Sequence, residues 1–266
     1  MASIFAKGRM EVSAGRVQSL QKPHYRSGNT AAAGSRRAYI DEIRRTDISR
    51  VDGVRRDPTK LGRLLRALAR NESTSATAAT IAADTGSGDA AIGDDTVRGY
   101  LDALERIMVV ENQQAWAPHL RSRSRLRQGP KRRFVDPSLA VASLRASPER
   151  LLGDMELFGF LFESLVIRDL RVYAQAADAD VFHYRDNTGL EVDAIVEAHD
   201  GRWAAFEVKL GQSAIDEASE TLRRFVGRVD TKKCGEPAML AVITGNGFAY
   251  VRPDGVAVIP IGNLGP

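Results

Sequence analysis

The amino-acid sequence predicts an α/β protein in which a mostly helical unit is followed by an α/β unit. Three observations support this. Apolar residues recur at helical spacing across residues 61–108. Residues 189–196 and 204–209 instead alternate between apolar and polar side chains, as strands with one buried face do. The apolar run 239–243 predicts a further strand of the same α/β layer.

The length and the changes of composition predict three segments. Residues 1–37 lack periodicity and are rich in Gly, Ala, Ser and Arg, which predicts a disordered or poorly packed arm. Residues 38–136 form the mostly helical unit, and residues 137–266 form the α/β unit. A chain of 266 residues is long enough for two modest domains.

The helical unit has the element order of a winged helix-turn-helix. A helix over 61–68 is followed by a short helix over 77–84 and by a third helix, which Asp94 or Asp95 can cap. Two short strands follow, near residues 109–110 and 134–135. This order predicts a winged-helix-like domain. The alternative is a helical domain used for protein contacts, because the outward face of the third helix carries both signs of charge.

A block of positive charge separates the two strands of the predicted wing. No acidic residue occurs between residues 112 and 135. Such a block can follow the phosphates of a nucleic acid, and the alternative is a solvated loop. The candidate nucleic-acid-binding residues are Arg121, Arg123, Arg125, Arg127, Lys131, Arg132 and Arg133.

Composition excludes several classes of protein. Cys234 is the single cysteine, so no internal disulfide can form, and a reducing cytoplasm is expected. No apolar run reaches the length of a membrane span, and residues 1–10 lack the apolar core of a signal peptide. A net charge of +4 is too small to identify a partner, so the distribution of charge is more informative.

Acidic and basic residues stand at matched positions on the two alternating strands. Glu191 and Asp193 share one face of the first strand, and Glu207 and Lys209 share one face of the second. Carboxylates hold a hard divalent cation through oxygen, and a lysine can position or activate water. The pattern therefore predicts a divalent-metal site of a phosphodiesterase. The alternative is an ordinary amphipathic hairpin with a charged outer face.

Two turn geometries compete between these strands. A two-residue turn at 200–201 pairs position 193 with 208 and puts Asp193 and Glu207 on opposite faces. A three-residue loop at 199–201, with Gly201 in the left-handed region, makes Asp193 face Glu207. Facing carboxylates are unfavourable in a sheet unless a cation lies between them or one of them is protonated.

A helix predicted over residues 158–173 precedes the strands, and Glu163 lies at the edge of its apolar stripe. A helical glutamate, then a strand aspartate, then a strand Glu-x-Lys is an order that resembles the PD-(D/E)XK nuclease superfamily. The family often places its first acid after a proline, whereas Asp193 follows Val192. The alternative for Glu163 is a solvated residue at the helix edge.

The resemblance implies a role for each polar residue. Glu163 would be an accessory acid and Lys209 would stand beside the attacking water. The candidate catalytic residues are Lys209, Glu163 and Glu191. The candidate ligands of Mg²⁺ or Mn²⁺ are Asp193, Glu207 and the carbonyl of Val208.

A larger resemblance covers residues 38–226. The motifs that carry it are Ile48-Ser49-Arg50-Val51, Asp57-Pro58-Thr59-Lys60-Leu61, Asp95-Thr96-Val97-Arg98-Gly99-Tyr100-Leu101, Phe134-Val135-Asp136, Phe162-Glu163, Tyr184-Arg185-Asp186 and Gly189-Leu190-Glu191-Val192-Asp193. Their order resembles the C-terminal domain of unknown function attached to bacterial and archaeal AAA-type ATPases. A phosphate-binding loop needs Gly-Lys, and no lysine here follows a glycine. We therefore expect a truncated relative that has no nucleotide site and does not hydrolyse ATP on its own.

Two functions follow from these patterns. The first is a nuclease-like, DNA-associated protein with a divalent-metal phosphodiesterase site. The alternative is a catalytically idle module that binds DNA or protein and works with a separate ATPase, because a fold does not fix an activity. The expected partners are nucleic acid, above all DNA, and a separate ATPase or another protein, and a membrane is not expected.

Overall fold

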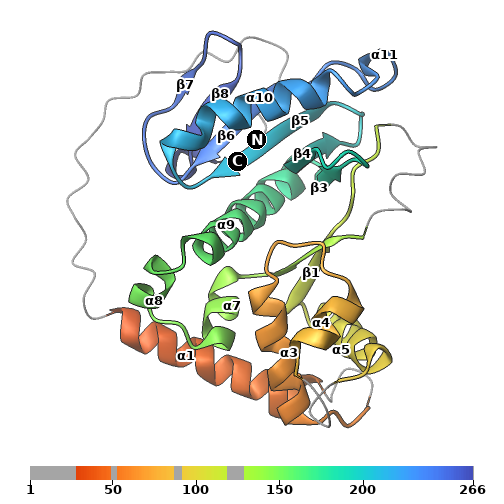
Figure 1. The fold of residues 1–266 in the computed structure, drawn as a ribbon, viewed down its shortest axis with the longest axis vertical. Coiled ribbons are helices and arrows are strands. Elements are labelled where there is room, and N and C mark those ends of the chain that lie inside the picture. Colours follow the sequence, from red (N-terminus) through yellow and green to blue (C-terminus); the bar gives the residue numbers. More distant parts are fainter. Residues whose placement is uncertain (1–27, 49–52, 87–91, 119–128, 266) are drawn as a thin grey trace.

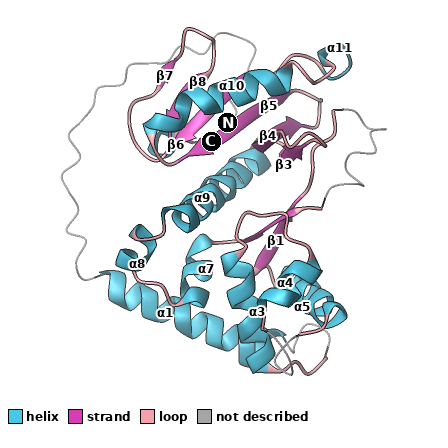
Figure 2. Ribbon diagram, viewed as in Figure 1, coloured by secondary structure: helices cyan, strands magenta, loops and turns pink. Residues whose placement is uncertain are grey.

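The computed structural model describes residues 28–48, 53–86, 92–118 and 129–265. Within these ranges the protein is a mixed α/β structure, as predicted (Figure 1). Figure 2 shows a helical body with a two-stranded ladder at one end and a larger sheet flanked by helices at the other. Among the described helices, none has both the length and the apolar character that crossing a lipid bilayer requires.

The helical body contains the three helices and two strands that the sequence predicts, in that order. Asp57 caps α3 through the Thr59 amide at 2.7 Å, and Thr77 caps α4 through the Thr80 amide at 3.1 Å. The elements of this body are α1 (Gly28–Glu42), η1 (Ile43–Asp47), α3 (Pro58–Arg70), α4 (Ala78–Asp84), α5 (Asp94–Arg106), β1 (Val110–Gln113), β2 (Lys131–Phe134), α7 (Pro137–Leu144) and α8 (Pro148–Leu152).

Two local expectations for this body are corrected. Residues 28–37 are helical and belong to α1, although the sequence predicts a disordered or poorly packed arm over 1–37; residues 1–27 lie outside the described ranges. The cap of α5 is Gly93 rather than Asp94 or Asp95. Both aspartates lie in the first turn of α5 instead, where their negative charge interacts favourably with the positive end of the helix dipole and stabilises the helix.

The helical core continues past the two-stranded ladder. α7 packs against α1 and α3, and Leu139 and Ala140 are buried in the same apolar cluster as Leu64 and Leu104. The π-helical turn η1 widens the end of α1, so that Ile43 and Ile48, five residues apart, are both fully buried. Leu161 of α9 (Met155–Ala176) belongs to this cluster as well, so the core of the helical half extends to the first helix of the α/β half.

The α/β half is one mixed sheet with helices on both faces. Its described strands lie in the order β3-β4-β5-β6-β8-β7; β3, β4 and β5 are antiparallel neighbours, and β6 runs parallel to β5. The strands are β3 (Ala179–Arg185), β4 (Glu191–Ala198), β5 (Trp203–Lys209), β6 (Met239–Thr244), β7 (Tyr250–Val251) and β8 (Ala257–Pro260). The helices are α9 (Met155–Ala176), η3 (Gln212–Ala214), α10 (Ile215–Val226), α11 (Thr231–Cys234) and η4 (Ile261–Asn263).

α9 and α10 cover opposite faces of this sheet (Figure 1). Val166 and Leu170 of α9 pack with Phe206 of β5 on one face. Leu222 and Phe225 of α10 pack on the other face, which also holds both tryptophans. β5 is buried along its length except at Lys209, as expected for a central strand.

A β-bulge corrects the expected alternation of β4. The sequence predicts that Leu190, Val192, Ala194 and Val196 share one face. In the structure, Leu190 and Val192 pack on the α10 side, whereas Ala194 and Val196 pack on the α9 side. The pairing of β3 with β4 shifts by one residue between Phe182 and Tyr184, and one extra residue reverses every later side chain.

The segment after β1 joins the two halves. Ala115 forms a parallel bridge with His183 of β3, and the Trp116 amide donates to the His183 carbonyl at 2.6 Å. The Trp116 ring lies 5.2 Å from the Trp203 ring and 5.9 Å from the Phe225 ring, between centroids. A chain segment of the helical half is thus fixed to the edge of the sheet by backbone and aromatic contacts.

The loop between β4 and β5 has three residues. Ala194 pairs with Phe206, and the Ala198 amide donates to the Arg202 carbonyl at 2.8 Å. Gly201 has φ of +85°, the left-handed conformation that this loop requires. The three-residue alternative is therefore confirmed, and the two-residue turn is wrong.

We predict that Gly201→Ala lowers the free energy of unfolding by about 1–2 kcal/mol, because an L-residue is strained at positive φ. Gly99 of α5 is the matched control, since a Cβ there meets open space. Gly99→Ala should raise the same free energy by about 0.5–1 kcal/mol. Urea denaturation of both variants checks the opposite signs, and equal effects would contradict the loop conformation.

Candidate functional site

Glu163 of α9 is directed toward β2 of the helical half. Its side chain is 11% exposed, and its Oε1 accepts hydrogen bonds from Arg133 Nη2 at 3.0 Å and from Lys131 Nζ at 3.2 Å. The side chain is therefore a buried ion-pair partner, and the alternative of a solvated residue at the helix edge is wrong.

Asp193 lies at the bulge of β4, where β4 and β5 part. Gln113 of β1 occupies the bulge, because its Nε2 donates to the carbonyls of Phe182 at 2.8 Å and Asp193 at 3.0 Å. The described β4–β5 ladder ends at Ala194. Beyond it, Asp193 Oδ2 accepts the Val208 amide at 2.9 Å, so a carboxylate takes the place of a backbone acceptor.

Glu207 and Lys209 are brought to the same place by β5. Lys209 Nζ lies 2.9 Å from Glu207 Oε2 and 4.0 Å from Asp193 Oδ2. Glu207 is almost fully buried, whereas the Lys209 side chain is 32% exposed. Asp193 and Glu207, two of the acids predicted from the two strands, therefore both lie near the ammonium group of Lys209.

Lys131 of β2 enters this cluster from the helical half. Its Nζ lies 3.2 Å from Glu163 Oε1 and 3.7 Å from Asp193 Oδ1, and its side chain is 7% exposed. One ammonium group thus lies between the acid of α9 and the acid of β4. Of these two acids, Asp193 is the one that the resemblance implies as a metal ligand.

Arg133 continues the network into the helical body. Its Nη1 donates to Ser73 Oγ at 2.6 Å, and Ser73 Oγ lies 2.8 Å from Ser164 Oγ. Ser164 Oγ donates to Glu72 Oε1 at 2.6 Å, and the same oxygen accepts the Phe134 amide at 3.1 Å. A chain of buried hydrogen bonds therefore runs from the acidic cluster to Glu72, in the turn that follows α3.

The pKa values follow from burial and from these neighbours. Burial raises the pKa of Glu207, and the charge of Asp193 raises it further. Burial alone would also raise the pKa of Asp193, but the ammonium groups of Lys131 and Lys209 outweigh it and hold that pKa below its usual range. Burial alone would lower the pKa of Lys209, but the charges of Asp193 and Glu207 outweigh it and raise that pKa. Asp193 is thus charged, whereas Glu207 is protonated more readily than an ordinary glutamate.

A cleft of about 540 Å³ opens onto this cluster. Its lining includes Lys131, Glu163, Asp193 and Lys209, together with Ser73–Ser75 and the start of α9. Glu191 lines the same cleft, but its carboxylate pairs with Arg185 Nη1 at 3.0 Å rather than with Lys209. The cleft gives a ligand a route to Lys209.

The donor set does not fit a metal ion in this arrangement. Among the described residues, no group of three or more His, Cys, Asp or Glu side chains is placed to hold one. Both oxygens of Asp193 are already engaged, one by Lys131 and the other by the Val208 amide. The expected ligands, Asp193, Glu207 and Val208, are therefore adjacent, but lysines neutralise their charge.

The predicted basic block is divided by the structure. Arg121, Arg123, Arg125 and Arg127 lie outside the described residues. Lys131 and Arg133 are only 6% and 1% exposed, so these two cannot follow phosphates as expected. The physical reason is their pairing with Glu163, since buried charges need partners. Arg132 is partly exposed and donates to the Ala76 carbonyl at 2.6 Å.

Sequence reasoning missed the parts of the network that the helical half supplies. Lys131 and Arg133 alternate with Arg132 on β2, and this period of two was the available signal that they share a buried face. Nothing local marks Gln113 or Glu72, because their partners lie at least 20 and at least 62 residues away, respectively.

Two family models match the chain. Residues 23–150 match a family described as Domain of unknown function (DUF8612), and residues 158–264 match a family described as Domain of unknown function (DUF4143). The second of these families is associated with AAA-type ATPases. No curated protein and no solved structure matches the chain. The boundary between the two matches falls near the start of α9.

Glu72 gives the network a pH dependence. Burial is the main cause that raises its pKa from 4.5 to about 8, and the hydrogen bond from Ser164 and the charge of Arg133 oppose it in part. The charge of Glu163 adds to the rise. Between the unfolded pKa and the folded one, the folded state holds a proton that the unfolded chain has lost. The free energy of unfolding therefore falls as pH rises through this window.

We predict that Glu72→Gln removes this loss, because glutamine stays neutral and its oxygen can still accept the Phe134 amide. The stability difference between variant and wild type should grow from about pH 5 to about pH 8, by at most about 1.4 kcal/mol per pH unit. Urea denaturation across this range measures it. Burial also lowers the pKa of His183 to about 4. The effect of His183 on the pH dependence of stability is the same in wild type and variant, so it cancels in the difference between them.

Glu220→Gln is the matched control for this prediction, since Glu220 is exposed on α10. Its stability should follow that of wild type at every pH. Parallel curves for Glu72→Gln and wild type would show that Glu72 is ionised throughout the folded state.

Proposed function

We propose that this chain is a nuclease-like module that contacts DNA and is catalytically idle in the arrangement described, with a separate ATPase as its working partner. The observation that carries the proposal is the Lys131 ammonium, which lies between Glu163 and Asp193 at 3.2 and 3.7 Å. A cation supplied by the protein neutralises the carboxylates that a metal would need.

The order of elements supports the nuclease-like part of the proposal. α9 carries Glu163, the antiparallel strands β3, β4 and β5 carry Asp193 and the Glu207-x-Lys209 pair, and α10 then leads to the parallel strand β6. This order is similar to that of PD-(D/E)XK proteins, in which one helix acid and two strand acids face a common cleft. The order α3, α4, α5 and then the β1–β2 ladder likewise supports a winged-helix-like unit.

The sequence supports DNA as the ligand. Residues 121–127 supply four arginines without an acidic residue, and such a run gives affinity for phosphates of any base sequence. The surface of α5 gives no support for reading bases in a groove, because Arg98 is paired with Asp94 at 2.9 Å. Contact with DNA through its backbone is therefore the form of binding that we propose.

A metal-dependent phosphodiesterase is the second candidate. The specific observation in its favour is Lys209, which lies next to Asp193 and Glu207 and is exposed at a cleft of about 540 Å³. In this arrangement Lys209 would bind or orient a phosphate at the cleft. For this candidate to hold, Lys131 must withdraw from Asp193 in the presence of substrate.

We predict that wild type and Lys209→Ala bind a short DNA duplex equally and that neither cuts it in Mg²⁺ or Mn²⁺. Gel assays of cleavage and fluorescence anisotropy measure the two properties. Calorimetry with Mn²⁺ should give the same heats for wild type and for the Asp193→Asn, Glu207→Gln double variant. Metal-dependent cutting by wild type that is absent from Lys209→Ala would establish the enzyme instead.

Lys131→Met tests directly whether the Lys131 ammonium group takes the place of a metal ion. Removing one partner of a buried ion pair should lower the free energy of unfolding by about 3–5 kcal/mol, whereas Lys232→Met, at an exposed position, should change it by about 0.5 kcal/mol or less. If Mn²⁺ raises the melting temperature of Lys131→Met and not that of wild type, the ammonium occupies the place of the metal.

Neutralising Arg121, Arg123, Arg125 and Arg127 together tests the DNA contact. The slope of log affinity against log salt should become shallower by about 0.9 for each phosphate that these arginines neutralise in wild type. An unchanged affinity and slope would remove DNA from the proposal, whatever the cleavage assay gives.

A further inference from the structure

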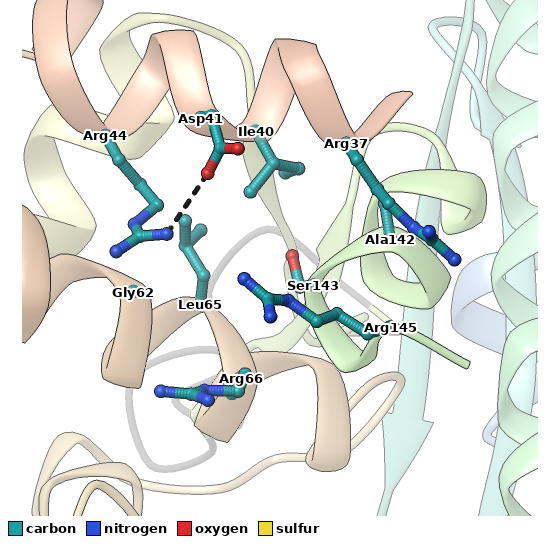
Figure 3. Close-up of a pocket in the computed structure, with 10 residues that line it drawn as sticks. All are labelled: Arg37, Ile40, Asp41, Arg44, Gly62, Leu65, Arg66, Ala142, Ser143 and Arg145. Atoms are coloured by element: carbon teal, nitrogen blue, oxygen red, sulfur yellow. Dashed lines mark hydrogen bonds and ion pairs between the residues drawn. The ribbon is translucent and has the colours of Figure 1, made fainter. Parts of the chain in front are cut away.

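A second pocket, of about 270 Å³, lies in the helical half (Figure 3). α1, η1, α3 and α7 enclose it, and its buried apolar wall is formed by Ile40 and Leu65. No residue of the acidic cluster lines it, so it is a separate site.

Arginine dominates the polar lining of this pocket. Four arginines, from four different elements or their ends, line the pocket together with a single acidic residue, Asp41. They are Arg37 of α1, Arg44 of η1, Arg66 of α3 and Arg145 at the end of α7. Cations that line one pocket repel one another, and an anion bound among them relieves the repulsion.

Arg44 is held in a fixed position in the pocket. Its Nε donates to the Pro58 carbonyl at 3.1 Å, and its Nη1 donates to Asp41 Oδ1 at 3.2 Å, the interaction drawn in Figure 3. The guanidinium group lies against Gly62, where a Cβ would come within 2.7 Å of Cζ, Nε and Nη2. Gly62 therefore provides the space in which Arg44 sits.

The other three arginines are available to a ligand. Within the described part of the chain, no hydrogen bond or ion pair engages the side chains of Arg37, Arg66 or Arg145. Figure 3 shows Arg66 and Arg145 on the side of Leu65 away from Asp41. Since Asp41 offsets only one of the four positive charges, the pocket suits an anion of more than one charge.

We propose that this pocket binds the phosphate group of a phosphorylated ligand. A phosphate monoester carries about −1.5 to −2 charges at neutral pH and presents three acceptor oxygens. The planar guanidinium group binds such oxygens in pairs. A volume of about 270 Å³ holds a phosphate or a pyrophosphate with little room for more, so the rest of the ligand extends into solvent. The proposal does not depend on the function assigned to the acidic cluster.

Two sources can supply this phosphate, a free phosphorylated small molecule or the backbone of a nucleic acid. Calorimetry with inorganic pyrophosphate tests the first, and anisotropy with a short DNA duplex tests the second. The variant is Arg66→Gln with Arg145→Gln. The matched control is Arg36→Gln with Arg150→Gln, two exposed arginines that do not line the pocket.

We expect the pocket variant to weaken pyrophosphate binding at least tenfold, because removing each charge-assisted hydrogen bond costs about a factor of ten or more. An equal loss of DNA affinity with a shallower salt slope assigns the phosphate to a nucleic acid, and unchanged DNA affinity assigns it to a small molecule. If pocket and control variants bind both probes like wild type, the proposal is overturned.

Gly62→Ala is a second, sharper variant. The added methyl group must displace the Arg44 guanidinium, while alanine favours the helix of α3 more than glycine does. We therefore expect pyrophosphate binding to weaken several-fold while the melting temperature stays the same or rises. Pyrophosphate binding equal to wild type in this stable variant would show that Arg44 has no part in the site.

Discussion

The buried ion pairs of Lys131 and Arg133 with Glu163 determine how the two halves of this protein fit together. The cations come from β2 and the acid from α9, so neither half can satisfy its own charges. An unpaired buried charge costs several kcal/mol, and a paired one can be nearly neutral. The need to avoid unpaired charge therefore favours one relative position of the two halves. In that position, α7 and Trp116 also make apolar contacts.

The same constraint explains the irregularities of the sheet. Gln113 crosses from β1 to hold the carbonyls of Phe182 and Asp193 at the bulge, and its own oxygen accepts from Arg133. Because the bulge ends the pairing of β4 with β5, the Val208 amide needs another acceptor, and the Asp193 carboxylate supplies it. The bulge, the parted strands and the position of the acid are thus consequences of one polar network.

The sequence predicted what depends on local pattern and missed what depends on distant partners. The order of the two strands and the glycine of their loop were sufficient to predict that Asp193, Glu207 and Lys209 lie close together, although the bulge changes the alternation of β4. The bulge could not be predicted, because the Gln113 side chain that hydrogen-bonds to it lies 80 residues away in the sequence. The same limit explains Lys131 and Arg133, which looked like part of an exposed basic run until Glu163 was placed beside them. A charge pattern shows which side chains need partners, and only the fold shows where the partners are.

The behaviour of Glu207 connects the structure to the choice between the two candidate functions. Its pKa is raised because it is buried and because Asp193 lies nearby, while Lys209 opposes the rise. The three carboxylates Asp193, Glu207 and Glu163 meet three cations, Lys131, Lys209 and Arg133, and Lys131 is shared between Glu163 and Asp193. A divalent cation would lower the pKa of Glu207 and release its proton, whereas without one the proton itself neutralises the group. Under the proposed idle function, one lysine and one proton would take the place of a metal, and an active protein would have to exchange both for the metal when substrate enters the cleft.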